Sequence, residues 1–201
     1  MTCKIPRLIT SVCLLSSVTL CSFVAPPDEV PGETLARMRK LGEELSKTNK
    51  NHDFLANLCG SWTTSTVTMG LPPDSGKATF KMIYGGRFLE GDHTGILMGF
   101  PFESKLLMGY DNYKHKFSAT FIDNLGTSMR NSEGVLDKKR TTLILWGTMD
   151  EWVSDEHDKP VMYVYKIIDN NHFVFAIHDL SIIGGDTNVI TVNYTRVKEC
   201  L

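Results

Sequence analysis

Six histidines are the first candidates for chemistry in this 201-residue chain, because imidazole can bind a metal or move a proton near neutral pH. His172 and His178 come closest to a metal-ligand spacing, but no third ligand accompanies them. His178 interrupts an apolar run, so it could face the interior and bind haem or another ligand, or it could be purely structural. We predict no metal site and no cofactor, with haem bound through His178 or His172 as the alternative.

Carboxylates are the second candidates, since two buried acids can act as general acid and base. Glu90 and Asp92 alternate within a strand-like segment, and we expect their shared face to be solvated. Asp123 precedes Asn124 and is expected to cap a turn, with ligand binding as its alternative role. No serine sits in a nucleophile elbow and no glycine loop suits a phosphate, so no catalytic residue is predicted and nothing requires an enzyme.

The overall charge of the chain bears on whether it could bind nucleic acid. The chain has 21 Lys and Arg against 23 Asp and Glu, with a formal net charge of -2 and a sequence pI of about 6.3. This balance offers no basic surface to a phosphate backbone, and the run Lys138-Lys139-Arg140 is expected at a hairpin tip. Nucleic-acid binding is therefore not expected.

Residues 1–25 are predicted to be a signal peptide or a lipoprotein signal. Lys4 and Arg7 precede an uncharged apolar stretch over residues 8–24, which is short for a membrane span. Cys21 ends a lipobox-like sequence and is a candidate for lipidation, although Leu20 stands where that motif prefers a small residue. We expect an exported protein that is periplasmic, secreted or lipid-anchored in the cell envelope, with an uncleaved anchor as the alternative.

Residues 26–60 are predicted to contain a spacer followed by two helices. Residues 26–50 are predicted to form a proline-rich spacer and an amphipathic helix with Leu35, Met38, Leu41 and Leu45 on one face. A second short helix, capped by Asn49 or Asn51, is expected to end at Gly60. Residues 51–201 are assigned to a single barrel domain.

After Gly60 the sequence predicts ten strands with turn residues between them. They lie near 61–70, 76–84, 87–97, 102–111, 116–123, 127–136, 141–149, 160–168, 172–178 and 188–197. Short strands joined by tight turns indicate an antiparallel meander, and closure into a barrel removes its exposed edges. The predicted fold is an all-β, ten-stranded antiparallel meander barrel with a helical lead-in.

Closure makes the two ends of the strand region neighbours. In a meander of even strand number the first and last strands pair antiparallel, which brings Trp62 beside Arg196 and Cys59 beside Cys200. We expect an arginine–indole contact that closes the barrel end. We also predict a Cys59–Cys200 disulfide in an oxidising compartment.

Aromatic and apolar residues are spread along the strands, and they could fill the barrel or line a cavity. Ten strands enclose a wider interior than eight, so a cavity is plausible on geometric grounds. The residues predicted to bind a ligand are Tyr84, Phe121, Asp123, Trp146, Tyr163, Tyr165 and His178.

The ordered set of motifs resembles a bacterial domain family of unknown function with a calycin-like barrel. The motifs are Phe54-Leu55-Ala56-Asn57-Leu58-Cys59-Gly60-Ser61-Trp62, Gly85-Gly86-Arg87-Phe88-Leu89, Met108-Gly109-Tyr110-Asp111-Asn112, Ile122-Asp123-Asn124-Leu125-Gly126-Thr127, Ser132-Glu133-Gly134 and Tyr194-Thr195-Arg196. The resemblance implies a cup related to lipocalins, fatty-acid-binding proteins and nitrobindin-type haem barrels. It implies no activity, and Thr63-Thr64-Ser65-Thr66 replaces the glycine-rich extension of the nitrobindins.

The function predicted from the sequence is binding of a small hydrophobic molecule by an exported barrel. The alternatives are a haem or metal barrel, an enzyme acting on a lipid-like substrate, and a structural protein with a filled core. Contact with a membrane is expected only through the signal anchor or a lipid.

Overall fold

The computed structural model describes residues 31–199. The predicted signal segment, Cys21 and Cys200 lie outside the described residues. Helix α1 (Pro31–Leu45) has no buried residue, whereas helix α2 (Lys50–Leu58) and the strands belong to one compact unit that begins at Lys40. Between residues 31 and 199, no helix combines the length and the apolar character needed to cross a membrane.

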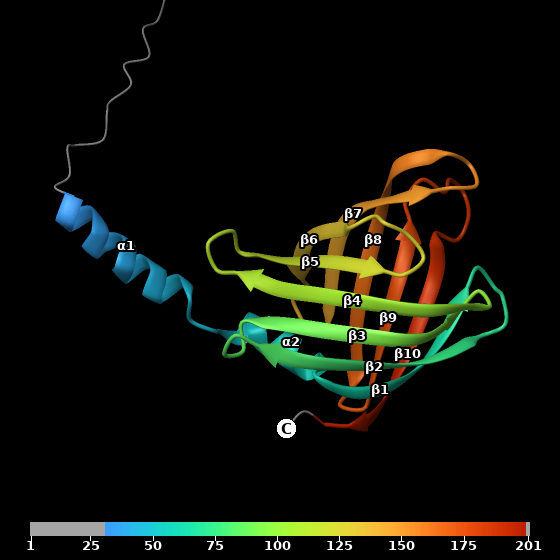
Figure 1. The fold of residues 1–201 in the computed structure, drawn as a ribbon, viewed down its shortest axis with the longest axis horizontal. Coiled ribbons are helices and arrows are strands. Elements are labelled where there is room, and N and C mark those ends of the chain that lie inside the picture. Colours follow the sequence, from blue (N-terminus) through green and yellow to red (C-terminus); the bar gives the residue numbers. More distant parts are fainter. Residues whose placement is uncertain (1–30, 200–201) are drawn as a thin grey trace, which may run out of the picture. The chain divides into compact units, whose positions relative to one another are not determined.

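Ten strands follow α2, as predicted (Figure 1). Their bounds are β1 (Gly60–Thr68), β2 (Asp74–Ile83), β3 (Phe88–Leu97), β4 (Phe100–Asp111), β5 (Lys116–Asp123), β6 (Arg130–Leu136), β7 (Thr142–Glu151), β8 (Glu156–Asp169), β9 (His172–Asp179) and β10 (Asn188–Lys198). Each strand pairs antiparallel with the next, and β1 pairs with β10, so the sheet is a closed barrel. The predicted meander barrel is confirmed.

Side chains alternate between the lumen and the outside along each strand. On β9, for example, Phe173 is buried and Phe175 and Ile177 pack against the buried core. On β3 the acidic residues lie outside, where Glu90 pairs with Lys81 at 2.6 Å and Asp92 with Lys105 at 2.7 Å. The expectation of a solvated Glu90–Asp92 face is therefore confirmed. Because side chains alternate along a strand, Gly91 and His93 face the lumen.

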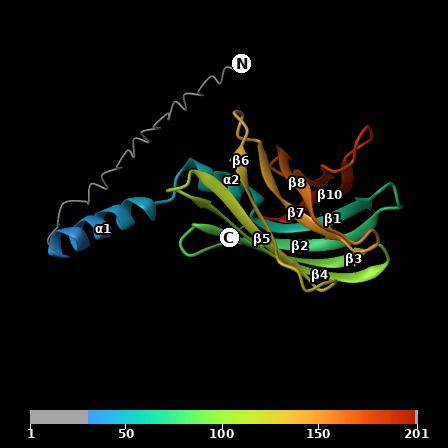
Figure 2. The same ribbon diagram turned by 90° about the horizontal axis from the view of Figure 1, so that it is seen from above.

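Helix α2 contributes to the buried core through Phe54, Leu55 and Leu58, whose exposed fractions are 2%, 0% and 1%. Phe54 packs edge-on against Phe117 of β5 with ring centroids 6.2 Å apart. Of the two caps considered, Asn49 is the N-cap: its side chain accepts from the Asn51 backbone N–H at 2.8 Å. Figures 1 and 2 both show α2 at one end of the barrel, which we call the closed end.

Arg196 of β10 joins α2 to the β1–β10 seam at the closed end. Its guanidinium carbon lies 4.0 Å from the centroid of the Trp62 ring. The same group donates to the carbonyl oxygens of Asn57 at 2.8 Å and Cys59 at 2.5 Å, at the end of α2, while Nε donates to Asn170 O at 2.6 Å. Carbonyls at a helix C-terminus lack helical partners, so one arginine satisfies them and covers the indole at once.

Candidate ligand-binding site

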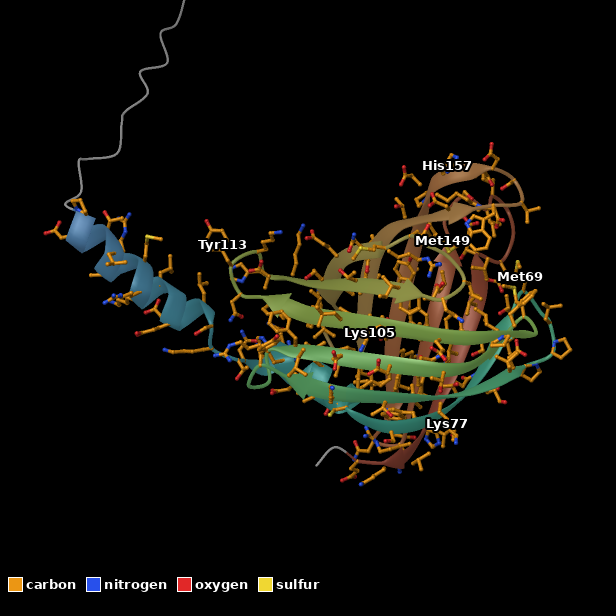
Figure 3. The ribbon with its side chains drawn as sticks, viewed as in Figure 1. Met69, Lys77, Lys105, Tyr113, Met149 and His157 are labelled. Atoms are coloured by element: carbon orange, nitrogen blue, oxygen red, sulfur yellow. The ribbon has the colours of Figure 1, made fainter. Side chains whose placement is uncertain are left out.

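The barrel encloses a cavity of about 560 Å³, within the usual range for small-molecule sites. Its lining begins at the aromatic residues above the closed end and continues to the loops β1–β2, β3–β4, β5–β6, β7–β8 and β9–β10. We call this second end the mouth. Met69 at the mouth and Tyr113 in the β4–β5 turn lie at opposite ends of the barrel in Figure 3.

Aromatic rings form the floor of the cavity. Phe173 and Tyr194 are stacked with centroids 4.0 Å apart, and Phe80 packs against both at 6.0 Å. Gly91 of β3 makes room for Phe80, because a Cβ at that position would lie 2.4 Å from the phenyl ring. The lumen below this level is filled, whereas the lumen above it is open.

A second aromatic group forms one wall. Tyr165 and Phe175 have ring centroids 4.7 Å apart, and Tyr163 stacks on Phe175 at 6.3 Å. Burial raises the pKa of both tyrosines above 10.0, so their hydroxyls stay protonated at neutral pH. These residues give the cavity an apolar surface with neutral polar edges.

His93 of β3 faces the cavity opposite this wall. Its Nε2 lies 3.1 Å from the hydroxyl of Thr64, and its ring contacts Phe102 and Tyr194 at centroid distances of 5.5 and 6.5 Å. Its Nδ1 is buried without a hydrogen-bond partner among residues 31–199, and so is the hydroxyl of Thr68. Both residues line the cavity, so two polar atoms there lack the partner that burial normally requires.

Two ion pairs lie nearer the mouth. Asp123 accepts from Arg130 at 2.6 Å, and the Arg130 guanidinium also lies 5.5 Å from the Phe121 ring. Lys159 contacts Asp179 at 2.8 Å, with side chains only 13% and 8% exposed. Burial opposes ionisation of Asp179, but hydrogen bonds from Lys159 and Ser181 outweigh it and hold the pKa of Asp179 below 3.8.

The Asp179→Asn substitution is expected to lower the free energy of unfolding by about 1–2 kcal/mol at pH 7, because it removes the charged acceptor of Lys159. A depressed carboxyl pKa stabilises the fold above the unfolded pKa, and that contribution is lost as the pH falls through the folded value. The difference between wild type and variant should therefore vanish in acid below 3.8. Urea unfolding across pH measures the difference in free energy between wild type and variant.

The control is Asp155→Asn, because the side chain of Asp155 is 94% exposed. An equal loss of stability in both variants would contradict the role given to the Lys159–Asp179 pair.

Four of the seven residues predicted to bind a ligand line the cavity: Phe121, Asp123, Tyr163 and Tyr165. Asp123 also keeps the turn-capping role expected for it, because its Oδ1 accepts from the Leu125 backbone N–H at 2.9 Å. The carboxylate therefore holds the loop with one oxygen and Arg130 with the other.

Tyr84, Trp146 and His178 are not at the cavity. Tyr84 follows the end of β2 in a turn with φ of 49° and is 75% exposed. Trp146 lies between inward-facing neighbours on β7 and is 48% exposed. His178 follows Ile177, which lines the cavity, so it points the other way and its Nδ1 lies 3.0 Å from the Thr187 hydroxyl.

The alternative of haem held by His178 or His172 does not fit this geometry. His172 is half exposed and lies 2.9 Å from Asp169 outside the lumen. Within the described part of the chain, no group of three or more His, Cys, Asp or Glu could hold a metal ion. Neither named histidine can therefore present a ring nitrogen to a group inside the barrel.

His93, Arg130, Lys159 and Asp179 were not identified from the sequence as site residues. For His93 a signal existed, because a solvated Glu90–Asp92 face requires His93 to point inward. For the ion pairs none did, since Asp123 and Arg130 meet across β5 and β6, and Lys159 and Asp179 across β8 and β9.

Exposed apolar side chains surround the mouth on the loops that border it. The most exposed are Met69 (68%), Met129 (64%), Trp152 (69%), Val153 (96%) and Ile183 (97%). Scattered exposed apolar residues are normal, but here they gather around one opening. The entrance is therefore as apolar as the cavity behind it.

Two solved structures are similar to this chain, and the likeness to the first of them supports the fold. Rv2717c from M. tuberculosis is 12% identical, with 75% of this chain and 99% of that chain covered and a TM-score of 0.52. A redesigned β-barrel is 13% identical, with 76% and 99% covered and a TM-score of 0.40. At 12% identity the likeness to Rv2717c concerns the fold alone.

Among curated proteins, none matches the chain significantly. Residues 47–196, which span α2 and all but the last residues of the barrel, match the family described as protein of unknown function (DUF1579). The chain therefore belongs to the DUF1579 family.

Proposed function

We propose that the protein binds a small hydrophobic molecule in the lumen of its barrel. The observation that carries this proposal is the cavity of about 560 Å³, which is open toward an apolar mouth and lined mainly by aromatic and aliphatic side chains. A structural protein with a filled core would have no such space. Apolar pockets with a few placed polar groups are typical of ligand-binding sites.

Binding rather than catalysis is the role that this geometry favours. The two cations at the cavity are each paired with a carboxylate, Arg130 with Asp123 and Lys159 with Asp179. The Ser181 hydroxyl donates to Asp179, but a carboxylate whose pKa is held below 3.8 is a weak base for activating a nucleophile. We further propose that the protein acts after export, with residues 1–25 as its signal and Cys21 as a candidate for lipidation. Mass spectrometry of the protein from its native envelope would reveal both the cleavage site and any lipid on Cys21.

Filling the lumen should abolish binding. Ser104 of β4 lines the cavity and is the cross-strand neighbour of His93 on β3. A Ser104→Phe substitution would place a phenyl ring in the open space of the cavity. We expect the affinity for the hydrocarbon fluorophore diphenylhexatriene to fall by at least about tenfold, since one ring occupies much of the site. Fluorescence titration measures this change.

The matched control is Leu107→Phe on the same strand. Leu107 is 46% exposed on the outer face, so the same ring added there should leave binding unchanged. If the wild-type protein binds no fluorophore, and native mass spectrometry finds no co-purifying molecule, the proposed function fails. Equal loss in both variants would mean that the fluorophore binds outside the lumen.

A further inference from the structure

Both cations that line the cavity are already paired with carboxylates. Arg130 is held by Asp123, whose side chain is 5% exposed. Lys159 is held by Asp179 at 2.8 Å and by Glu156 at 3.3 Å. An anionic ligand could engage either cation only by displacing its carboxylate partner, which would leave a buried charge unpaired.

The polar atoms that do lack a partner are uncharged. Among the buried side-chain atoms of residues 31–199 they are His93 Nδ1 and Thr68 Oγ1, and both residues line the cavity. Burial lowers the pKa of His93 below 6.5, so its imidazole is neutral at pH 7. A neutral imidazole whose Nε2 is engaged by Thr64 has Nδ1 left as one further donor or acceptor, depending on the tautomer. That nitrogen is buried as the ring stands, so a ligand in the cavity reaches it by a rotation of the His93 side chain.

Building on the proposed function, we propose that the ligand is an uncharged amphiphile whose hydroxyl or carbonyl oxygen hydrogen-bonds to His93 Nδ1. A hydroxyl serves either tautomer of His93, because it can both donate and accept. The apolar body of the ligand then lies against Phe121, Tyr163 and Phe175 and extends toward the mouth. Fatty-acid carboxylates are selected against, since Arg130 and Lys159 are both engaged with acidic partners.

A series of ligands with one chain length tests the head group. Dodecanol, dodecanoic acid and dodecylamine would each compete with diphenylhexatriene for the wild-type protein at pH 7. We expect dodecanol to bind at least about tenfold more tightly than either charged molecule, because a buried unpaired charge costs more than one lost hydrogen bond.

The outcomes separate the two proposals. Equal or tighter binding of the acid or the amine overturns the choice of an uncharged head group, while binding in the lumen still stands. The same conclusion follows if the fluorophore binds and none of the three displaces it. If the fluorophore itself does not bind and no molecule co-purifies, the proposed function fails.

Substitution of His93 tests the contact itself. His93→Leu should weaken dodecanol about 3- to 10-fold, the effect of one hydrogen bond, and leave the hydrocarbon fluorophore unaffected. His93→Gln keeps a polar group and should recover part of the loss, whereas His178→Leu removes an outward-facing histidine and should change nothing. Unchanged dodecanol binding in His93→Leu would overturn the assignment. Retained binding of the fluorophore shows that the variant has folded.

Discussion

Replacing Trp62 with alanine is expected to lower the free energy of unfolding by about 3–5 kcal/mol, the range for large aromatic residues removed from a core. Trp62 is 2% exposed and packs edge-on against Phe173 with ring centroids 4.7 Å apart. Its Nε1 donates to the carbonyl oxygen of Leu58 at 3.0 Å, and Arg196 covers its ring. One substitution therefore removes contacts to β9, to α2 and to the β1–β10 seam together.

Urea unfolding followed by far-UV circular dichroism measures this loss. Trp146→Ala is the matched control, because the same side chain is removed from the 48% exposed outer face of β7. We expect that control to change stability by no more than about 1 kcal/mol. Similar losses in the two variants would show that Trp62 does not hold the closed end together.

The second large effect concerns the predicted disulfide. On β1 and β10, Trp62 lies opposite Arg196 and Ser61 lies opposite Lys198, with a shift in register between the two pairs. Cys59 directly precedes β1, and β10 ends at Lys198, two residues before Cys200 in the sequence. Cys200 lies outside the described residues, so the bond stays a prediction.

Cys59→Ser and Cys200→Ser are each expected to destabilise the oxidised protein by about 3–5 kcal/mol, because the bond would close a loop of nearly the whole barrel. The double variant should be no less stable than either single variant, and reductant should lower the wild type to the same level. Urea unfolding with and without reductant measures these losses. Mass spectrometry of peptides released without reduction should join the Cys59 and Cys200 fragments. Two separate free thiols in oxidised protein would refute the pairing.

Local patterns in the sequence were enough to predict the barrel. The alternation in Phe117, Ala119 and Phe121 identifies a strand with one buried face, and turn residues separate it from its neighbours. When such a meander closes, an even number of strands makes the first and last strands pair antiparallel. The largest error in bounds is β8, which begins at Glu156 rather than near residue 160, because pairing with the end of β7 extends it.

The cavity could be predicted only in part, because residue type does not fix which face a residue occupies. The aromatic rings of Trp146 and Tyr84 predict a place in the lumen, yet Trp146 lies on the outer face and Tyr84 in a turn. His178 was chosen because it breaks an apolar run, although its neighbour Ile177 takes the inward position. Ion pairs such as Lys159–Asp179 depend on cross-strand register, which local sequence patterns do not specify.

The meander topology also bears on how the barrel folds. Nine strand pairings join neighbours in the chain and can form as hairpins, whereas β1 and β10 meet only after the whole strand region has been ordered. Pairing across such a separation carries the largest loop-closure entropy in the molecule. Closure is therefore expected late in folding. The close ring contacts of Trp62 with Phe173 and Arg196, and of Phe173 with Tyr194, lie at this junction. Until β1 and β10 join, the sheet has two open edges and an uncovered aromatic floor, so the open barrel is the folding species most prone to aggregate.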